Sequence, residues 1–349
     1  MAKKQKELNN KELALFFDQF AMTLDAGLNH TDGIQIMLED AASSDGKRIL
    51  EVMLETLHEG KPLSKAFESP GVFPKYTLDM IAIGERSGKT DDVAHSLSDY
   101  YAREENIAQG IKNAVTYPLL IIFMMFIVIL VLIIRVLPVF NQVFVQLGSE
   151  MSGFSRALLN LGNAISRYSL VLMAILFLII ILYFLLSKTR SGRRMFNRFL
   201  QRFPVTKGFY NKIAAGRFAS SMALTMNTNL GPDESLQMVE KIVDNREVEA
   251  KIAECREMIR GGLSFTDALV DSRIFNNLYS RMISVGGKAG AIDKALSKIA
   301  VNYAAEIDDR IGNIISILEP TLVIIFSIIV CMILLSVMMP LMSIMSSIG

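Results

Sequence analysis

Three apolar runs constrain this chain more than any other feature of its sequence. Residues 119–134 are apolar throughout, residues 170–186 contain no charge, and residues 320–349 are also uncharged. About 20 apolar residues in a helix span the ~30 Å hydrocarbon core of a bilayer. The chain of 349 residues is 51% hydrophobic and has a mean hydropathy of +0.37, which is high for a soluble domain. The sequence therefore predicts a membrane protein with three transmembrane helices.

The distribution of basic residues predicts the orientation of these helices. Seven Lys and Arg residues lie between positions 188 and 207, whereas residues 138–167 carry only Arg156 and Arg167. Lys and Arg are enriched in cytoplasmic loops, where they also meet anionic lipid. The polar start MAKKQKELNN lacks the apolar core of a cleavable signal peptide. We therefore expect a cytoplasmic N-terminus, an extracytoplasmic C-terminus and a basic segment that contacts membrane lipid.

The predicted cytoplasmic regions contain an internal repeat with an offset of 202 residues. Between positions 73 and 118, eleven of the 46 residues are identical to the residue 202 positions later. These identical pairs include Gly84 and Gly286, Gly88 and Gly290, Asp91 and Asp293, and Pro118 and Pro320. Such self-similarity indicates duplication of one structural unit. Each copy runs directly into an apolar segment.

Both copies show the periodicity of helices. Apolar residues recur at intervals of three and four in residues 13–24 and 292–307, without a convincing strand alternation. We predict an all-α integral membrane protein with three transmembrane helices and two homologous cytoplasmic helical bundles, each of about six short helices. The predicted order is a cytoplasmic domain at 1–112, a transmembrane helix at 113–137, an extracytoplasmic connection at 138–167, a transmembrane helix at 168–187, a basic segment with the second cytoplasmic domain at 188–315, and a transmembrane helix at 316–349.

The sequence IAIGERSGKT at positions 81–90 is close to a phosphate-binding loop but does not match one. The pattern G-x-x-x-x-G-K-[ST] needs four residues between its glycines, so that backbone N–H groups can surround a phosphate. Only three separate Gly84 from Gly88, and the β-branched Ile83 occupies the position where the glycine is needed. The second copy, GGKAGAIDK, keeps both glycines but has no Lys-Thr pair. Nucleotide binding by this turn is therefore not predicted.

A G-x-x-x-G turn followed by an aspartate is what the two copies share at this position. The residues are Gly84, Gly88 and Asp91 in the first copy and Gly286, Gly290 and Asp293 in the second. One interpretation is a tight joint between two helices, where the carboxylate caps the next helix and opposes its dipole. The other is a partner-binding loop. The sequence leaves both interpretations open.

Proline marks the entry of both copies into the membrane. Pro118 and Pro320 follow long helical patterns, and Glu319 lies beside the second proline. A proline inside a helix removes a backbone hydrogen bond and produces a kink, whereas a proline in the first turn of a new helix is well tolerated. On the first interpretation, Pro118, Glu319 and Pro320 form a hinge that redirects motion at the membrane surface. On the second, these residues only shape the spans.

These motifs resemble the type II secretion system F family, the inner-membrane platform proteins of type II secretion and type IV pilus assembly machines. The first copy reads IAIGERSGKTDDVAHSLSDYYAREENIAQGIKNAVTYPLL, and the second has the family's glutamate and proline before the last apolar run. The family usually has glutamate where this chain has Gly287, so a function of Glu85 would not extend to the second copy. The resemblance covers nearly the whole chain, including the order of domains and apolar runs.

The resemblance implies a non-enzymatic platform in the bacterial inner membrane. Its partners would be a cytoplasmic assembly ATPase, pilin or pseudopilin subunits and other inner-membrane assembly proteins. Glu85 and Arg86 differ between the copies while the glycines do not. Because binding specificity usually resides in exposed turns, this turn and the adjoining Asp91 are the candidate ATPase-binding surface. We also expect a homo-oligomer.

Other functions are less consistent with the sequence. His30, His58 and His95 are isolated from one another, so we predict no catalytic site, no metal site and no cofactor. A formal net charge of +1 gives no reason to expect nucleic acid as a partner. An oligomeric transporter or channel is the alternative, although the apolar spans carry only Arg135 and Glu319, both near span ends. Whether the machine serves secretion, motility or DNA uptake is left open.

Overall fold

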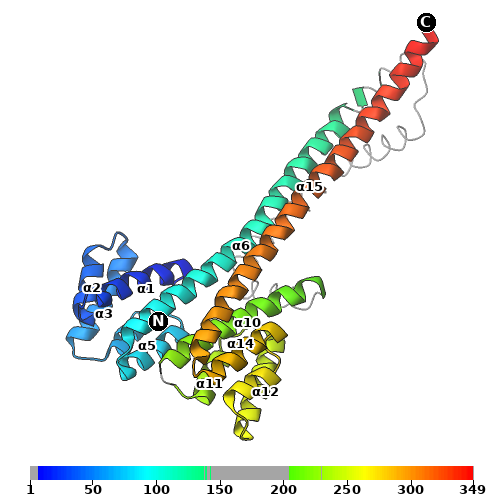
Figure 1. Ribbon diagram of the computed structural model, residues 1–349. Helices are drawn as coiled ribbons and strands as arrows, with labels where there is room; N and C mark the ends of the chain where they lie inside the picture. The colour runs from blue at the N-terminus through cyan, green and yellow to red at the C-terminus, as the bar shows by residue number, and fades with distance from the viewer. Residues whose placement is uncertain (1–6, 137, 140–141, 143–203, 229, 349) are drawn as a thin grey trace. The chain divides into compact units, whose positions relative to one another are not determined.

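The structure is a computed structural model that describes residues 7–136, 138–139, 142, 204–228 and 230–348 (Figure 1). These described residues form helices joined by short turns, with no strand among them. The chain divides into unit 1, Met1–Gln109 with Gln201–Asp308, and unit 2, Gly110–Leu200 with Asp309–Gly349. The predicted transmembrane helix at 168–187 and nearly all of the connection at 138–167 lie outside the described residues.

Five short helices and the start of a sixth build the first domain of unit 1. They are α1 (Asn10–Asp25), α2 (His30–Glu39), α3 (Ser44–His58), α4 (Leu63–Glu68), α5 (Lys75–Ser87) and α6 (Thr90–Val131). Asn9, Asn29 and Ser43 accept backbone N–H groups at the starts of the first three helices. Such caps satisfy donors that have no partner within the helix. In α1 the Asn9 N–H also donates to Glu12 at 2.7 Å, which completes a capping box.

The second domain repeats this plan. Its helices are α10 (Pro204–Asn227), α11 (Pro232–Glu240), α12 (Arg246–Arg260), α13 (Phe265–Asp271), α14 (Asn277–Lys288) and α15 (Ile292–Ile348). From α11 to α15, each helix begins 202 residues after its counterpart in the first domain, which is the offset of the sequence repeat. Pro232 occupies the first turn of α11, where its missing N–H costs nothing, and Asn245, Ser264 and Asn276 cap the next three helices.

Each domain of unit 1 has its own apolar core. In the first domain, the buried rings of Phe17 and Phe67 stack with centroids 5.8 Å apart. In the second, Phe218 and Phe275 lie 5.7 Å apart. Burying a phenylalanine side chain stabilises a fold by about 1.5–3 kcal/mol, so these clusters hold the short helices together. Leu224 of α10 is buried in the core of the first domain, so α10 also joins the two domains.

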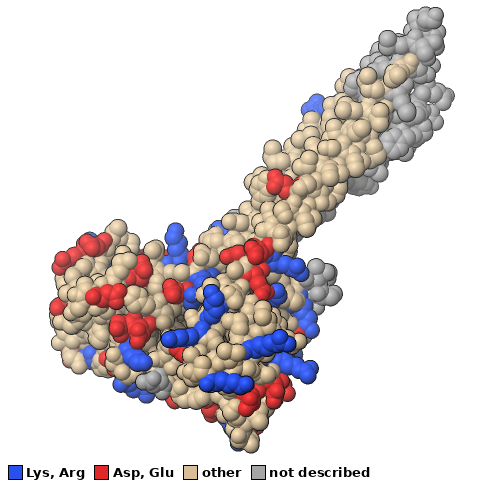
Figure 2. All heavy atoms as spheres, in the orientation of Figure 1, with Lys and Arg blue, Asp and Glu red and all other residues tan. Residues whose placement is uncertain are grey.

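The sixth helix of each domain is long, although the apolar periodicity predicts short helices. Helix α6 runs through Pro118 to Val131 and is followed by a π-helical turn, η1 (Leu132–Val136), and α15 runs through Pro320 to Ile348. By length and composition, α6 and residues Ile292–Leu335 of α15 could each cross a membrane. Figure 2 shows many charged side chains over unit 1 and few on the described surface of these helices in unit 2. The first and third apolar runs are therefore helical.

Candidate interaction site

The G-x-x-x-G turn of the first domain is a tight joint between α5 and α6. Gly88 follows α5 with a φ of +67°, a left-handed conformation that favours glycine. The Lys89 N–H donates to the Gly84 carbonyl at 2.9 Å and closes the end of α5. A Cβ atom at Gly84 would lie 2.9 Å from Cγ2 of Val93 on α6. One glycine therefore permits the turn, and the other permits close packing of the two helices.

The second domain has the same joint between α14 and α15. Gly290 has a φ of +66°, and the Ala291 N–H donates to the Gly286 carbonyl at 2.8 Å. A Cβ atom at Gly286 would lie 2.7 Å from Cβ of Ala295 on α15. The glycines that the two copies share thus have the same backbone and packing role in both domains.

Glu85 caps a different helix of its own domain. Its Oε1 accepts the Leu63 N–H at 2.5 Å and its Oε2 accepts the Ser64 N–H at 3.0 Å, at the start of α4. The residue before α4 is Pro62, whose side chain makes no capping hydrogen bond. Partial burial alone would raise the pKa of the Glu85 carboxyl, but the hydrogen bonds from Ser64 and Leu63 outweigh it and hold the pKa below its usual range. Glu85 therefore supplies the cap that Pro62 cannot.

In the second domain, the residue directly before the equivalent helix α13 supplies the cap. Ser264 occupies the position of Pro62, and its Oγ accepts the Asp267 N–H at 3.2 Å. Gly287 occupies the position of Glu85, and a Cβ atom there would overlap the hydroxyl of Thr266. The two copies therefore differ at both positions together: the first has Pro62 with Glu85, and the second has Ser264 with Gly287.

The other candidate residues of the first turn differ in exposure. Arg86 is exposed at the end of α5 and Asp91 is exposed in the first turn of α6. Asp293 lies in the first turn of α15, where, as with Asp91, a negative charge opposes the helix dipole. The Lys89 Nζ donates to the Asn227 carbonyl at the end of α10, at 2.8 Å. Lys89 thus stabilises a helix C-terminus, a role different from that of a phosphate-loop lysine.

A bidentate ion pair joins the two domains of unit 1. Arg217 of α10 donates from Nε to Glu104 Oε1 at 2.9 Å and from Nη2 to Oε2 at 2.5 Å. Next to it, Arg103 Nη2 donates to Ser220 Oγ at 3.1 Å. Burial alone would lower the pKa of Arg217, but Glu104 outweighs it and raises the pKa above its usual value. The pair lines a cavity of about 20 Å³, room for about one water molecule.

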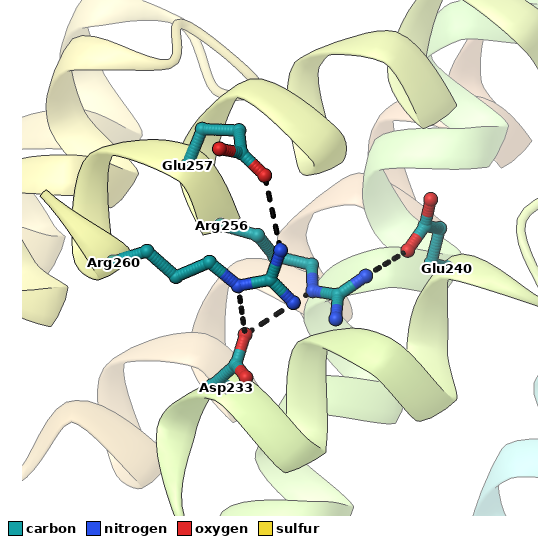
Figure 3. Close-up of polar contacts among 5 residues, drawn as sticks. All are labelled: Asp233, Glu240, Arg256, Glu257 and Arg260. Atoms are coloured by element: carbon teal, nitrogen blue, oxygen red, sulfur yellow. Dashed lines mark hydrogen bonds and ion pairs between the residues drawn. The ribbon is translucent and has the colours of Figure 1, made fainter.

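A second ionic network lies on α11 and α12 of the second domain (Figure 3). Arg256 contacts Glu240 at 2.7 Å and Asp233 at 3.2 Å, and Arg260 lies 3.1 Å from Glu257. The Arg256 side chain is only 13% exposed. The equivalent positions of Arg256 and Glu240 in the first domain hold the apolar residues Leu54 and Leu38. One copy therefore pairs these helices by charge where the other uses apolar contact.

The membrane-entry residues lie on α6 and α15 of unit 2. Pro118 and Pro320 both lie inside continuous helices, so neither is in the first turn of a new helix. The Tyr117 hydroxyl donates to Glu319 Oε1 at 3.0 Å, and these residues occupy equivalent positions of the repeat. The Glu319 carboxylate therefore accepts a hydrogen bond from the neighbouring helix.

Sequence comparison identifies the repeated domain. A family model for the type II secretion system (T2SS) protein F matches residues 16–138 and again residues 218–340. The chain belongs to the T2SS protein F family. The two matched segments are offset by 202 residues, so the internal repeat is a duplication of the T2SS protein F domain. Family membership and two long apolar helices together indicate an inner-membrane protein.

Relatives of this T2SS protein F family member carry pilus and secretion names. The type IV pilus assembly protein PilC of Myxococcus xanthus is 26% identical over 91% of this chain and 76% of its own length. PilC of Thermus thermophilus is 26% identical over 97% of this chain and 84% of its own length. The type II secretion system protein F of Aeromonas hydrophila is 24% identical over 95% of this chain and 86% of its own length. The family resemblance read from the sequence is confirmed.

Sequence reasoning missed the ion pair between the domains. Arg217 aligns with Leu15 in the repeat, and that change from apolar to charged was the available signal. Its partner Glu104 aligns with Glu306, which instead binds Lys212 and Tyr279 within the second domain. Among the described residues, no group of three or more His, Cys, Asp or Glu side chains is placed to hold a metal ion.

Proposed function

We propose that this protein is a non-enzymatic inner-membrane platform for assembly of type IV pili or type II secretion pseudopili. It links a cytoplasmic assembly ATPase to the insertion of pilin or pseudopilin subunits, together with other inner-membrane assembly proteins. The observation that carries this proposal is the double match to the T2SS protein F domain, with relatives named for both machines over most of the chain.

The proposed topology places both domains of unit 1 in the cytoplasm. Three transmembrane helices, at 113–137, 168–187 and 316–349, would leave the N-terminus cytoplasmic and the C-terminus extracytoplasmic. The basic residues between 188 and 207 support this orientation through the positive-inside rule. The many charged side chains over unit 1 are consistent with a location in water (Figure 2).

We place the ATPase-binding surface on the exposed part of the first turn. Arg86 and Asp91 are exposed there, whereas the Glu85 carboxylate is committed to the start of α4. Charge reversal at Glu85 would uncap α4 as well as alter the surface, so it tests recognition poorly. Arg86 is the better probe because, within the part of the chain that the structure describes, its side chain makes only one long hydrogen bond, 3.3 Å to the Ala82 carbonyl of its own helix.

Co-purification from native membranes tests this proposal. A tagged full-length chain should capture the assembly ATPase, and Arg86→Glu should reduce the captured amount several-fold because an exposed charge at an interface controls association. Lys288 is the exposed equivalent of Arg86 in the second domain, so Lys288→Glu is the matched control and should leave capture unchanged. Equal capture by both variants would remove the first turn as the binding surface. Absence of the ATPase from wild-type complexes would contradict the platform function.

A further inference from the structure

The contact between the two domains of unit 1 has an apolar part. Leu224 of α10 is buried in the core of the first domain, and Leu230 and Met238 of the second domain pack against the same core. Burial of apolar surface stabilises the docked domains, but the effect is non-directional. This apolar contact therefore favours docking without selecting one orientation of the second domain over similar ones.

The same contact has a polar part, which we name the polar contact. It consists of Arg217 and Ser220 of α10 with Glu104 and Arg103 of α6, and Ser220 lies one helical turn before Leu224. The Arg217 guanidinium makes two hydrogen bonds to the Glu104 carboxylate, and Arg103 donates to Ser220. A bidentate pair fixes the relative position of two planar groups, because a shift of either group breaks at least one of the bonds.

The polar contact is poorly suited to adding stability. An ion pair that leaves water has a desolvation cost, and apolar residues in its place are often as stable or more stable. Arg103 Nε is buried and has no hydrogen-bond partner among the described residues. A cavity with room for about one water molecule lies beside the pair, between α6, α10 and α15, so apolar packing does not fill this space. The presence of these polar groups therefore needs an explanation other than stability.

The polar contact is also not required by the fold of the duplicated domain. The equivalent positions in the other copy hold different residues, which are Leu15 for Arg217, Asp18 for Ser220 and Ala305 for Arg103. Glu104 is equivalent to Glu306, but Glu306 binds Lys212 and Tyr279 within its own domain. Because each copy folds without one half of this set, these residues serve the contact between the domains.

We propose that the polar contact selects the single orientation in which the two domains dock, while the apolar contact around Leu224 supplies most of the stability. Arg217 is the positioning residue. Beside it, Gly216 permits close approach of α10 to α15, since a Cβ atom at Gly216 would lie 2.9 Å from Cβ of Tyr303. Helices α6 and α15 both continue out of unit 1, so one orientation of the domains also fixes the spacing of these helices within unit 1. The proposal does not depend on the function proposed above.

Distances between two spin labels test the orientation directly. The full-length chain is used with the exposed Cys331 replaced by Ser; Cys255 can remain because it is buried and burial raises its pKa to about 12. Labels are attached at Glu51→Cys on α3 and Glu249→Cys on α12, which are exposed positions in the first and second domains. Labelled chain is diluted with unlabelled chain, so that double electron–electron resonance measures distances within one molecule. We expect one narrow distance distribution.

Two variants of the labelled chain separate orientation from stability. Arg217→Leu combined with Glu104→Leu leaves no buried charge unpaired, so the distribution should broaden several-fold while the thermal unfolding midpoint stays close to that of the parent. Leu224→Ala should have the opposite effect, a lower midpoint with a narrow distribution, because it removes buried apolar contact and keeps the directional bonds. Arg256→Leu combined with Glu240→Leu makes the same change inside the second domain and is the matched control, with a distribution as narrow as that of the parent.

The opposite results overturn the proposal. A narrow distribution in the variant with both Arg217→Leu and Glu104→Leu would show that apolar contact alone selects the orientation. A much lower unfolding midpoint in that variant would show that the pair acts through stability, and a broad distribution in the labelled parent would show that the domains hold no single orientation. Arg217→Lys keeps the charge but loses the fork of donors, so it should also broaden the distribution, and an unchanged distribution in this variant would overturn the role of the bidentate geometry.

Discussion

At the scale of single residues, Glu85 joins two helices through its carboxylate. Glu85→Gln keeps one acceptor oxygen but turns an NH₂ group toward a backbone N–H at the start of α4. Since loss of a helix cap or of a charged hydrogen bond costs about 1–2 kcal/mol, we expect a lower thermal unfolding midpoint for the full-length chain, measured by circular dichroism. Glu51→Gln, on the exposed surface of α3, is the control. An unchanged midpoint for Glu85→Gln would contradict the capping role.

The same carboxylate gives a dependence on pH. The pKa of Glu85 is lower in the folded state than its ordinary value of 4.5. Its stabilising contribution is therefore complete above the unfolded-state pKa and is lost as the pH falls through the folded-state pKa. Glu85→Gln should reduce the loss of stability below about pH 4.5. If this variant loses stability at low pH as the wild type does, other carboxyl groups control that loss.

Sequence reasoning identified the divergence at Glu85 but not its physical cause. The hydrogen bond from Leu63 spans 22 residues, and no local pattern predicts which distant helix a carboxylate will cap. In contrast, Gly84 and Gly88 were recognisable because a left-handed turn and close helix packing both require glycine at fixed positions. The exchange of Pro62 for Ser264 was the signal in the sequence that a cap had been replaced.

At the scale of helices, the ionic network of α11 and α12 can be compared with its apolar counterpart. Arg256→Leu alone leaves Glu240 without its partner and should destabilise the protein by about 2–3 kcal/mol. The double variant Arg256→Leu with Glu240→Leu copies Leu54 and Leu38 of the first domain and should lie within about 1 kcal/mol of wild type. Chemical denaturation measures both. Arg260→Leu is the exposed control, and a double variant less stable than Arg256→Leu would contradict the comparison.

The same scale includes the membrane-entry segment of α6 and α15. If these helices transmit motion, Pro118→Ala, Pro320→Ala and Glu319→Gln should each reduce filament output, because the prolines remove helix hydrogen bonds and Glu319 binds Tyr117. Membrane insertion and ATPase capture should stay normal. Tyr117→Phe isolates the hydrogen bond from the charge of Glu319. Wild-type output from all of these variants, counted by electron microscopy at normal protein levels, would mean that the residues only shape the spans.

At the scale of the whole molecule, the duplication could be recognised from the sequence because it preserves residue spacing. The offset of 202 residues appears in the sequence, in the helix boundaries and in the two family-model matches. The contact between the two domains could not be predicted from the sequence, because it depends on which apolar residues become buried in the folded protein. Leu224 is buried, whereas its equivalent Met22 is also apolar but exposed. Identical periodicity can therefore produce either a core residue or a free surface.

As a platform, this chain would be required for filament assembly. The most direct measurement is the number of pili or pseudopili in a strain that lacks this chain, counted by electron microscopy, with the levels of pilin and assembly ATPase held at wild type. We expect loss of filaments and their recovery when the full-length chain is supplied. Normal filament numbers without the chain would contradict the claim, and solute flux through the purified chain in vesicles would then favour a transporter or channel.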